Sequence, residues 1–301
     1  MLVVRSLAVP SRSSEYWSWT FGQVPEGVKN CHNLSVITDS LPPRYRAFMR
    51  VLLLILLASA VAGCGGGDED AAPPTSDVAA AEKTVKTCVP ASTRLIGSPT
   101  TTYAAVVQER ADAFRSPGAG RLAVFGRKNV NGVSTVFAVL AERVGADCRA
   151  DWYRVQLPLK PNGSTGWVRA DAVELAPVTA RIEVDLSERL VTLYDAGRRV
   201  LSTPAAIGSP QTPTPTGEYY VNQRLVPADE SGPFGPGAVG ISAFSEVLTG
   251  WTQGGPIAIH GTNRPDLIGR AVSNGCIRVR NDVLRRIFDQ ALAGTPVTVR
   301  S

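Results

Sequence analysis

Apolar and polar residues alternate along several stretches in the C-terminal part of the chain, and this period is typical of half-buried β-strands. Gly- and Pro-rich segments, such as Gly208 to Gly217, separate these stretches and indicate turns. The pattern therefore predicts a β-rich domain over residues 179–301. Its strands are predicted at residues 181–186, 189–194, 200–207, 217–222 and 295–299.

A single short helix is predicted before the last of these strands. Asn281 is expected to be its N-cap, Asp282 lies in its first turn, and Gly294 is expected to stop it. The apolar positions that follow helical spacing are Val283, Leu284, Ile287, Phe288 and Leu292.

Residues 88–176 contain shorter apolar runs between Gly, Pro and Asn, which indicates a preceding all-β domain. The end of this segment, Trp152 to Leu157 followed by Gly166-Trp167-Val168, resembles the end of bacterial SH3-like barrels, where a tryptophan closes a small β core. The resemblance implies a small SH3-like β barrel that binds cell-wall peptide or glycan, or that serves as a spacer. The apolar runs are residues 103–107, 122–125, 135–144, 152–157 and 166–173.

A short apolar run at residues 51–62 follows Arg50 and ends in Gly63-Cys64. It is too short to span a bilayer stably, so it is predicted to be the core of a signal peptide. The sequence Val61-Ala62-Gly63-Cys64 resembles the lipobox of bacterial lipoproteins, in which the cysteine receives a diacylglyceryl group and becomes the mature N-terminus. Residues 49–63 are accordingly predicted to be a lipoprotein signal peptide starting at Met49, and Cys64 the lipidation site. The alternative is an ordinary apolar helix.

Two flanking segments follow from this prediction. Residues 1–48 show no consistent period and are predicted to be an upstream extension that lies before the true start. Residues 64–87 are small, polar and Pro-bearing, so they bury too little apolar surface to fold and are predicted to be a flexible tether. The mature chain is then expected to be extracytoplasmic and held to the cell membrane by its lipid.

The charge of the mature chain argues against a nucleic-acid partner. The 301 residues carry a formal charge of +5, but residues 1–63 hold six basic and three acidic residues, so their removal lowers it to +2. No basic cluster remains that would follow a phosphate backbone. With 44% hydrophobic and 19% charged residues, the composition is that of a soluble globular protein.

Cys88 and Cys148 flank the predicted SH3-like domain. Outside the reducing cytosol they could pair as a disulfide, although the sequence does not place their Cα atoms within bonding distance.

No metal site is predicted, because no cluster of residues has the spacing of metal ligands. No cofactor or phosphate-binding loop is predicted either.

The stretch from His260 to Arg278 carries the candidate chemistry. A cysteine acts as a nucleophile through its thiolate, which needs a base nearby and N–H donors where charge develops on a carbonyl oxygen. His260 is the only histidine after residue 64, and it ends a strand-like run. Gly275 before Cys276 permits a tight turn. Taken alone, such a pair is more often structural than catalytic.

The order of the residues adds a resemblance. His260-Gly261-Thr262, followed by Ser273-Asn274-Gly275-Cys276-Ile277-Arg278, resembles the signature of the L,D-transpeptidase catalytic domain family, also called YkuD-type. Residues 207–208 and 214–217 also look like its loop and strand. The resemblance covers roughly Thr179 to Arg300.

The resemblance implies a role for each matching position. Cys276 matches the nucleophile and His260 the general base, and Gly275 with the Cys276 amide matches the turn that forms the oxyanion hole. Gly261 and Ser273 match supporting positions. The positions toward the substrate are Arg278, Thr262 and Asn274. Many members have a second histidine where this chain has Asn274, so this position is not required for proton removal here.

The implied activity is acyl transfer on peptidoglycan stem peptides. The thiolate would form a thioester with the third residue of a tetrapeptide stem, and an amine of a neighbouring stem would then attack it. Water in place of the amine would give an L,D-carboxypeptidase. A non-catalytic cell-wall-binding lipoprotein is the alternative from another class, and none of these readings fixes an oligomeric state.

Two further features lie upstream of His260. Phe244 and Trp251 could wall a substrate cleft, but core packing is the favoured interpretation. Residues 226–241 are rich in Gly and Pro and are hypothesised to form a mobile flap beside the site.

Overall fold

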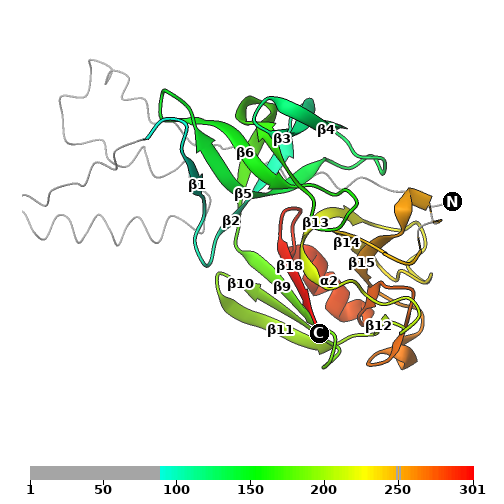
Figure 1. The fold of residues 1–301 in the computed structure, drawn as a ribbon. Coiled ribbons are helices and arrows are strands. Elements are labelled where there is room, and N and C mark those ends of the chain that lie inside the picture. The colour runs from blue at the N-terminus through cyan, green and yellow to red at the C-terminus, as the bar shows by residue number, and fades with distance from the viewer. Residues whose placement is uncertain (1–88, 249, 251) are drawn as a thin grey trace, which may run out of the picture. The chain divides into compact units, whose positions relative to one another are not determined.

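The computed structural model describes residues 89–301 except 249 and 251. The predicted upstream extension, signal peptide and tether lie outside the described residues, as do Cys64, Cys88 and Trp251. The described part of the chain is predominantly β and contains one α-helix, labelled α2 (Figure 1). The prediction of a mainly β fold with a single short helix is confirmed.

Residues 89–178, here called the N-terminal β region, form one sheet in the order β4-β3-β7-β6-β5-β2-β8, with β1 pairing β5. Its core includes Val107, Phe137 and Val155, all at most 1% exposed. The strands are β1 (Thr93–Leu95), β2 (Thr102–Val107), β3 (Arg110–Ser116), β4 (Ala119–Gly126), β5 (Val136–Val144), β6 (Ala150–Gln156), β7 (Thr165–Arg169) and β8 (Val173–Val178). The SH3-like assignment of this region stays a prediction.

Two details of this region differ from the sequence-based expectation. The run 166–173, expected as one strand, is divided by the short 3-10 helix Ala170–Ala172 into β7 and β8. Strand β3 was not predicted, because its buried positions are Ala111 and Ala113, whose small side chains give a weak hydrophobic signal.

Residues 179–301, here called the C-terminal β region, form a second sheet in the order β11-β10-β9-β18-β13-β14-β15-β17, beside a two-stranded parallel pair β12-β16. The strands are β9 (Ala180–Asp185), β10 (Leu190–Asp195), β11 (Arg198–Pro204), β12 (Ile207–Gly208), β13 (Gly217–Leu225), β14 (Ala238–Phe244), β15 (Pro256–His260), β16 (Ala271–Ser273), β17 (Ile277–Arg278) and β18 (Pro296–Arg300). Short 3-10 helices lie at Thr252–Gly254 and Pro265–Leu267.

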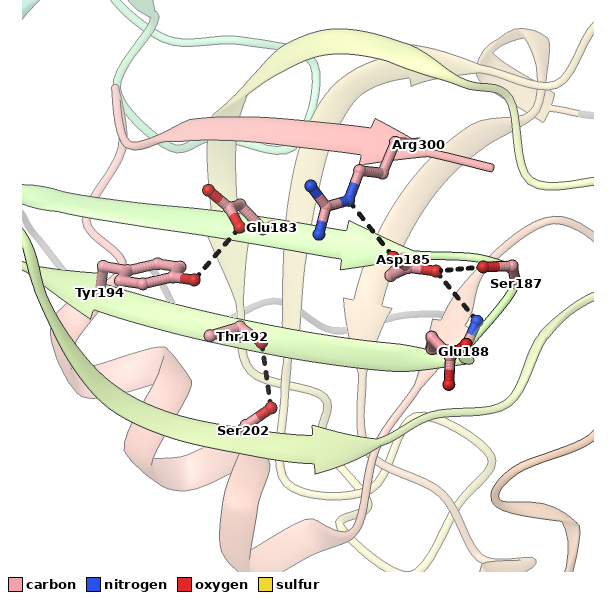
Figure 2. Close-up of polar contacts among 8 residues, drawn as sticks. All are labelled: Glu183, Asp185, Ser187, Glu188, Thr192, Tyr194, Ser202 and Arg300. Atoms are coloured by element: carbon pink, nitrogen blue, oxygen red, sulfur yellow. Dashed lines mark hydrogen bonds and ion pairs between the residues drawn. The ribbon is translucent and has the colours of Figure 1, made fainter.

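The alternation that predicted β9 separates the two faces of the sheet. Ile182 and Val184 are fully buried in the core. Glu183 and Asp185 lie on the opposite face, where Glu183 accepts a hydrogen bond from Tyr194 at 3.2 Å and Asp185 pairs with Arg300 at 3.3 Å (Figure 2). Such partly exposed contacts contribute little stability, so the apolar face holds this part of the sheet.

Helix α2 (Asn281–Gln290) packs on the sheet through Leu284, Ile287 and Phe288. The helix begins one residue earlier than predicted: Arg280, and not Asn281, is the N-cap, and it makes no side-chain capping bond. The Asn281 side chain is instead used by a neighbouring loop, as described below. Leu292 was expected on the helix, but it lies beyond its end and is 38% exposed.

Hydrogen bonds and a small apolar cluster join the two β regions, which belong to one compact unit. The Asn162 side chain both donates to and accepts from the Phe244 backbone, at 2.9 and 2.8 Å. Gln156 donates to the Glu218 carbonyl at 2.6 Å. The apolar cluster contains Ala104, Val136 and Val178 with Ala293. The contact between the regions is therefore specific and partly polar.

Cys148 lies in the turn between β5 and β6 and is disulfide-bonded. Its expected partner, Cys88, lies outside the described residues. The pairing of these two cysteines stays a prediction.

Candidate functional site

Two parallel strands bring the two halves of the sequence motif together. Strand β15 ends at His260 and pairs in parallel with β17, so that His260 lies opposite Arg278. The Val279 N–H donates to the His260 carbonyl at 2.9 Å. Strand β16 ends at Ser273, and only the turn 274–276 separates it from β17. Residues far apart in sequence therefore meet at one end of the sheet.

His260 and Cys276 line the same pocket, whose volume is about 140 Å³. The Cys276 Sγ lies 4.0 Å from the Pro256 carbonyl oxygen. The ring of Phe234 lies 4.9 Å from the ring of His260, with an angle of 56° between their planes. Arg278 and Asn274 also line this pocket. The expected thiol and imidazole thus share a small, partly aromatic enclosure.

The hydrogen bond of His260 fixes its tautomer. Its Nδ1 lies 2.6 Å from the carbonyl oxygen of Gly261. A carbonyl oxygen only accepts, so Nδ1 carries the proton of the neutral ring and Nε2 keeps a free electron pair. Burial, assisted by the charge of Arg278, lowers the pKa of His260 to about 4, although the bond to Gly261 opposes this shift. Near neutral pH His260 is therefore an uncharged base.

Burial also keeps the Cys276 thiol protonated in the free protein. Burial raises the pKa of the thiol. Hydrogen bonding of Cys276 to the Ala258 backbone and the charge of Arg278 act in the opposite direction. A preformed thiolate–imidazolium pair is not favoured, because burial disfavours the charged form of both partners. The resting arrangement is a neutral thiol beside a neutral imidazole.

The turn before Cys276 is held by Ser273. Its hydroxyl donates to the Cys276 carbonyl at 2.5 Å and accepts from the Gly275 N–H at 3.1 Å. Gly275 has φ +105°, and a Cβ there would lie 2.9 Å from Cδ1 of Ile257. Only glycine fits both demands. Because the Gly275 N–H is used inside the turn, the Cys276 N–H is the remaining amide for an oxyanion site.

A second layer of hydroxyl groups supports this turn. The buried Thr214 hydroxyl accepts from the Gly208 N–H and donates to the Gly275 carbonyl, each at 2.9 Å. Thr212 donates to the Ser273 carbonyl at 3.0 Å. Sequence reasoning had recognised the loop around Thr214 but had given its hydroxyl no role. No signal in the sequence gave it one, because the hydroxyl joins Gly208 to Gly275, which is distant in the sequence.

Gly261 and Thr262 shape the loop after His260 and do not line the pocket. The Thr262 N–H donates to Oδ1 of Asn281 at 2.7 Å, and the Thr262 hydroxyl accepts from the Arg264 N–H at 2.9 Å. A Cβ at Gly261 would lie 2.8 Å from Pro236 Cδ. The structure therefore gives Thr262 a place in loop support, whereas the sequence suggested one toward the substrate.

Arg278 is held through its backbone while its side chain faces the pocket. It exchanges two backbone hydrogen bonds of 2.8 Å with Ala206. Its Nε is buried and has no hydrogen-bond partner among the described residues. A guanidinium group in this state is suited to receive a carboxylate.

The segment 226–241, hypothesised to be a flap, is in part a pocket wall and in part a buried strand. Its residues Pro233 and Phe234 line the pocket beside His260. Its last four residues belong to the buried strand β14, so a flap can include residues 226–237 at most. Phe244 is half-buried and does not line this pocket. Phe234 is the aromatic side chain that the sequence analysis missed.

Within residues 89–301, apart from the two positions left undescribed, no group of His, Cys, Asp and Glu side chains could hold a metal ion. The same part of the chain contains no helix long and apolar enough to cross a membrane.

Comparisons with known proteins identify the family to which the chain belongs. The family model of the YkuD L,D-transpeptidase catalytic domain matches residues 179–299. The putative L,D-transpeptidase YkuD of Bacillus licheniformis is 33% identical over 165 residues, which cover 52% of this chain and 92% of that relative. The putative L,D-transpeptidase YkuD of Bacillus subtilis is 36% identical over 118 residues, covering 39% of this chain and 64% of the relative.

Among solved structures, a mutant of the Enterococcus faecium L,D-transpeptidase matches at 26% identity and a TM-score of 0.30, covering 40% of this chain and 49% of that chain. Family membership rests on the family model and on the Bacillus licheniformis relative. The chain belongs to the YkuD-type L,D-transpeptidase family, and the resemblance stated for residues 179–300 is confirmed.

Proposed function

We propose that this protein is a peptidoglycan L,D-transpeptidase in which Cys276 is the nucleophile and His260 the general base. The observation that carries the proposal is the fixed tautomer of His260, whose Nδ1 bond to Gly261 leaves Nε2 unprotonated in the pocket that Cys276 also lines. Family membership supports the substrate class, since the matched relatives are named L,D-transpeptidases.

The first step forms a thioester. Nε2 of His260 takes the proton from Sγ of Cys276, and the sulfur attacks the carbonyl carbon of the third residue of a tetrapeptide stem. The oxygen of the tetrahedral intermediate is stabilised by the Cys276 N–H. The bond to the terminal D-alanine breaks, and its nitrogen leaves as an amine with the proton held by His260.

The second step transfers the acyl group. The side-chain amine of the third residue on a neighbouring stem attacks the thioester carbonyl and gives a proton to His260. The carbon–sulfur bond breaks and the thiol is restored, leaving a cross-link between two third residues. Water as the acceptor would make the protein an L,D-carboxypeptidase, so the products of the reaction decide between the two.

Arg278 is proposed to hold the carboxylate of the leaving D-alanine. Its side chain lines the pocket, and its Nε has no partner among the described residues. Its positive charge favours the Cys276 thiolate but disfavours protonated His260, so we assign Arg278 to carboxylate binding and not to the proton transfer. Ser273 and Thr214 are positioning residues, because they act through the turn and touch no reacting atom.

Intact-mass spectrometry of the full-length chain tests the proposal. The protein is incubated with a carbapenem and, in parallel, with a tetrapeptide stem, beside a Cys276→Ala variant whose folding is checked by its melting temperature. A covalent adduct on the wild type alone, with release of D-alanine, is the expected result. A folded wild type that gives neither adduct nor turnover would contradict the proposal and favour a wall-binding, non-catalytic lipoprotein.

We also propose that the protein works outside the cytoplasm, anchored by a lipid on Cys64. The support is the lipobox-like sequence before this residue and the extracytoplasmic location of peptidoglycan. The Cys64→Ser variant should leave the membrane fraction of cells. A variant that stays membrane-associated would end the lipid-anchor proposal without affecting the catalytic one.

A further inference from the structure

A second, larger cavity lies between the two β regions and borders the candidate active pocket. Its volume is about 470 Å³, against about 140 Å³ for the pocket of Cys276. Pro256 lines both cavities, and its carbonyl oxygen lies 4.0 Å from Sγ of Cys276. We call this cavity the interregion groove. The smaller pocket holds only the end of a stem peptide, so the rest of a peptidoglycan substrate must lie outside it.

The floor of the interregion groove is built by a β-bulge. Successive residues of a strand point to opposite faces, yet Asn222 and Gln223 both line the groove. The pairing of β13 with β14 shifts between Val221 and Gln223, and such a shift re-aims a side chain. The residue paired with Gln223 is Gly240, where a Cβ would lie 2.6 Å from Cγ of Gln223. Bulge and glycine together make room for two adjacent amides.

The N-terminal β region fixes the orientation of one of these amides. Oε1 of Gln223 accepts from Nδ2 of Asn129 at 3.0 Å and from Nδ2 of Asn131 at 2.8 Å. The oxygen is thereby occupied. The NH₂ group of Gln223 donates no hydrogen bond within the described residues and is left as a donor at the groove.

Asn222 adds a polar group that lacks a partner. Its Oδ1 is shielded from water and has no hydrogen-bond partner among the described residues. A buried oxygen in this state costs free energy. Rotation of the amide toward a ligand donor in the groove would recover that loss.

The chemistry of the lining identifies the ligand class. The described lining contains one charged side chain, Lys128, and no carboxylate, so it offers no partner for the free amine of a stem peptide. Neutral amides and the rings of Phe125 and Phe244 make up much of the remainder. Amide groups hydrogen-bond hydroxyl and acetamido groups, and aromatic rings pack on the C–H faces of sugar rings.

We propose that the interregion groove binds the N-acetylated sugar chain of peptidoglycan, while the attached stem enters the pocket of Cys276. The inference rests on the proposed function for its substrate, and it assigns to both β regions a share in one binding site. It requires no covalent step.

Calorimetric titration of the full-length chain with chitotetraose, an uncharged N-acetylated sugar chain, tests the inference. Gln223→Glu keeps an oxygen for Asn129 and Asn131 and removes the NH₂ donors, so it should weaken binding about tenfold. Gln108→Ala, which removes an exposed amide outside the groove, is the matched control and should bind as the wild type does. Cellotetraose, which lacks the acetamido groups, should bind more weakly than chitotetraose.

Asn222→Leu separates a binding role from a structural one. Removing an oxygen without a partner should raise the melting temperature of the free protein and at the same time weaken chitotetraose binding. A variant that loses stability and binding together would point to a structural role and contradict the inference, as would unchanged chitotetraose binding in Gln223→Glu.

The outcome is independent of the catalytic proposal. Cys276→Ala should bind chitotetraose as the wild type does, and the groove variants should react with a carbapenem at the wild-type rate. Absence of chitotetraose binding, or displacement of bound chitotetraose by the tetrapeptide stem alone, would overturn the inference even if Cys276 is acylated. Loss of acylation alone would leave it standing.

Discussion

The two β regions differ in what they bury. The N-terminal β region buries two polar side chains, Thr135 and Gln156, and Gln156 is bonded across to the other region. Among the residues whose burial is described, the C-terminal β region buries ten polar side chains, and four of them, His260, Thr262, Ser273 and Thr214, lie in or around one turn and one loop. A buried polar group costs free energy unless it is hydrogen-bonded. Most of the buried polar side chains therefore lie in the region that holds the candidate site, and four of them gather around that site.

The strongest test of this contrast removes the base. His260→Gln keeps a polar side chain of similar length but no basic nitrogen, so the rate of acylation of Cys276 by a carbapenem should fall about 10³-fold. Stopped-flow measurements of the adduct give this rate. If the variant keeps a rate within tenfold of the wild type, His260 is part of the scaffold and the contrast between the regions fails.

The next test strains the turn. Gly275→Ala adds a Cβ at φ +105° and against Ile257, and should lower the free energy of unfolding by about 3 kcal/mol. Gly269→Ala is its control, since that residue has φ +86° but nothing within 4 Å of the added Cβ, and about 1 kcal/mol is expected. If urea unfolding gives the same loss of unfolding free energy for both variants, the close packing of Gly275 against Ile257 does not contribute to the destabilisation.

The buried histidine should also make stability depend on pH. Its pKa is about 4 when folded and 6.5 in the reference state, so the unfolded chain binds the extra proton as the pH falls through this window. Stability due to neutral His260 is complete above pH 6.5 and is lost toward pH 4, by up to about 3 kcal/mol. The loss should be smaller in His260→Gln. A parallel pH dependence of both proteins in urea unfolding would show that other groups cause it.

The smallest effect concerns the hydroxyl layer. Thr214→Val leaves the Gly208 N–H and the Gly275 carbonyl without their partner and should cost about 2 kcal/mol of stability. Thr298→Val removes an exposed contact with Glu218 and should cost less than about 0.5 kcal/mol. If the two substitutions are equivalent in thermal unfolding, Thr214 is not part of a buried network.

The strands of the C-terminal β region were predictable because their apolar residues are large and alternate, as at Ile182 and Val184. Strand β3 was missed because its core positions are alanines. Strand β14 was missed because six of its seven residues are buried, so apolar and polar residues do not alternate along it. His260 and Cys276 could be singled out from the order of the residues and the family resemblance, and both line one pocket in the structure. Phe234, Thr214 and Asn281 could not, because their roles depend on pairings between distant segments.

The position of strand β18 has a consequence for the order in which the sheet folds. Although it is the last strand in sequence, it lies inside the sheet and joins β9 on one side to β13 on the other. Until residues 296–300 have been synthesised, the half of the sheet formed by β13, β14, β15 and β17 cannot be joined to the half formed by β9, β10 and β11. Joining of the two halves of the sheet is therefore expected to be a late step in the folding of this region. Before that step, the edges of β9 and β13 that β18 covers lie open to pairing with other chains.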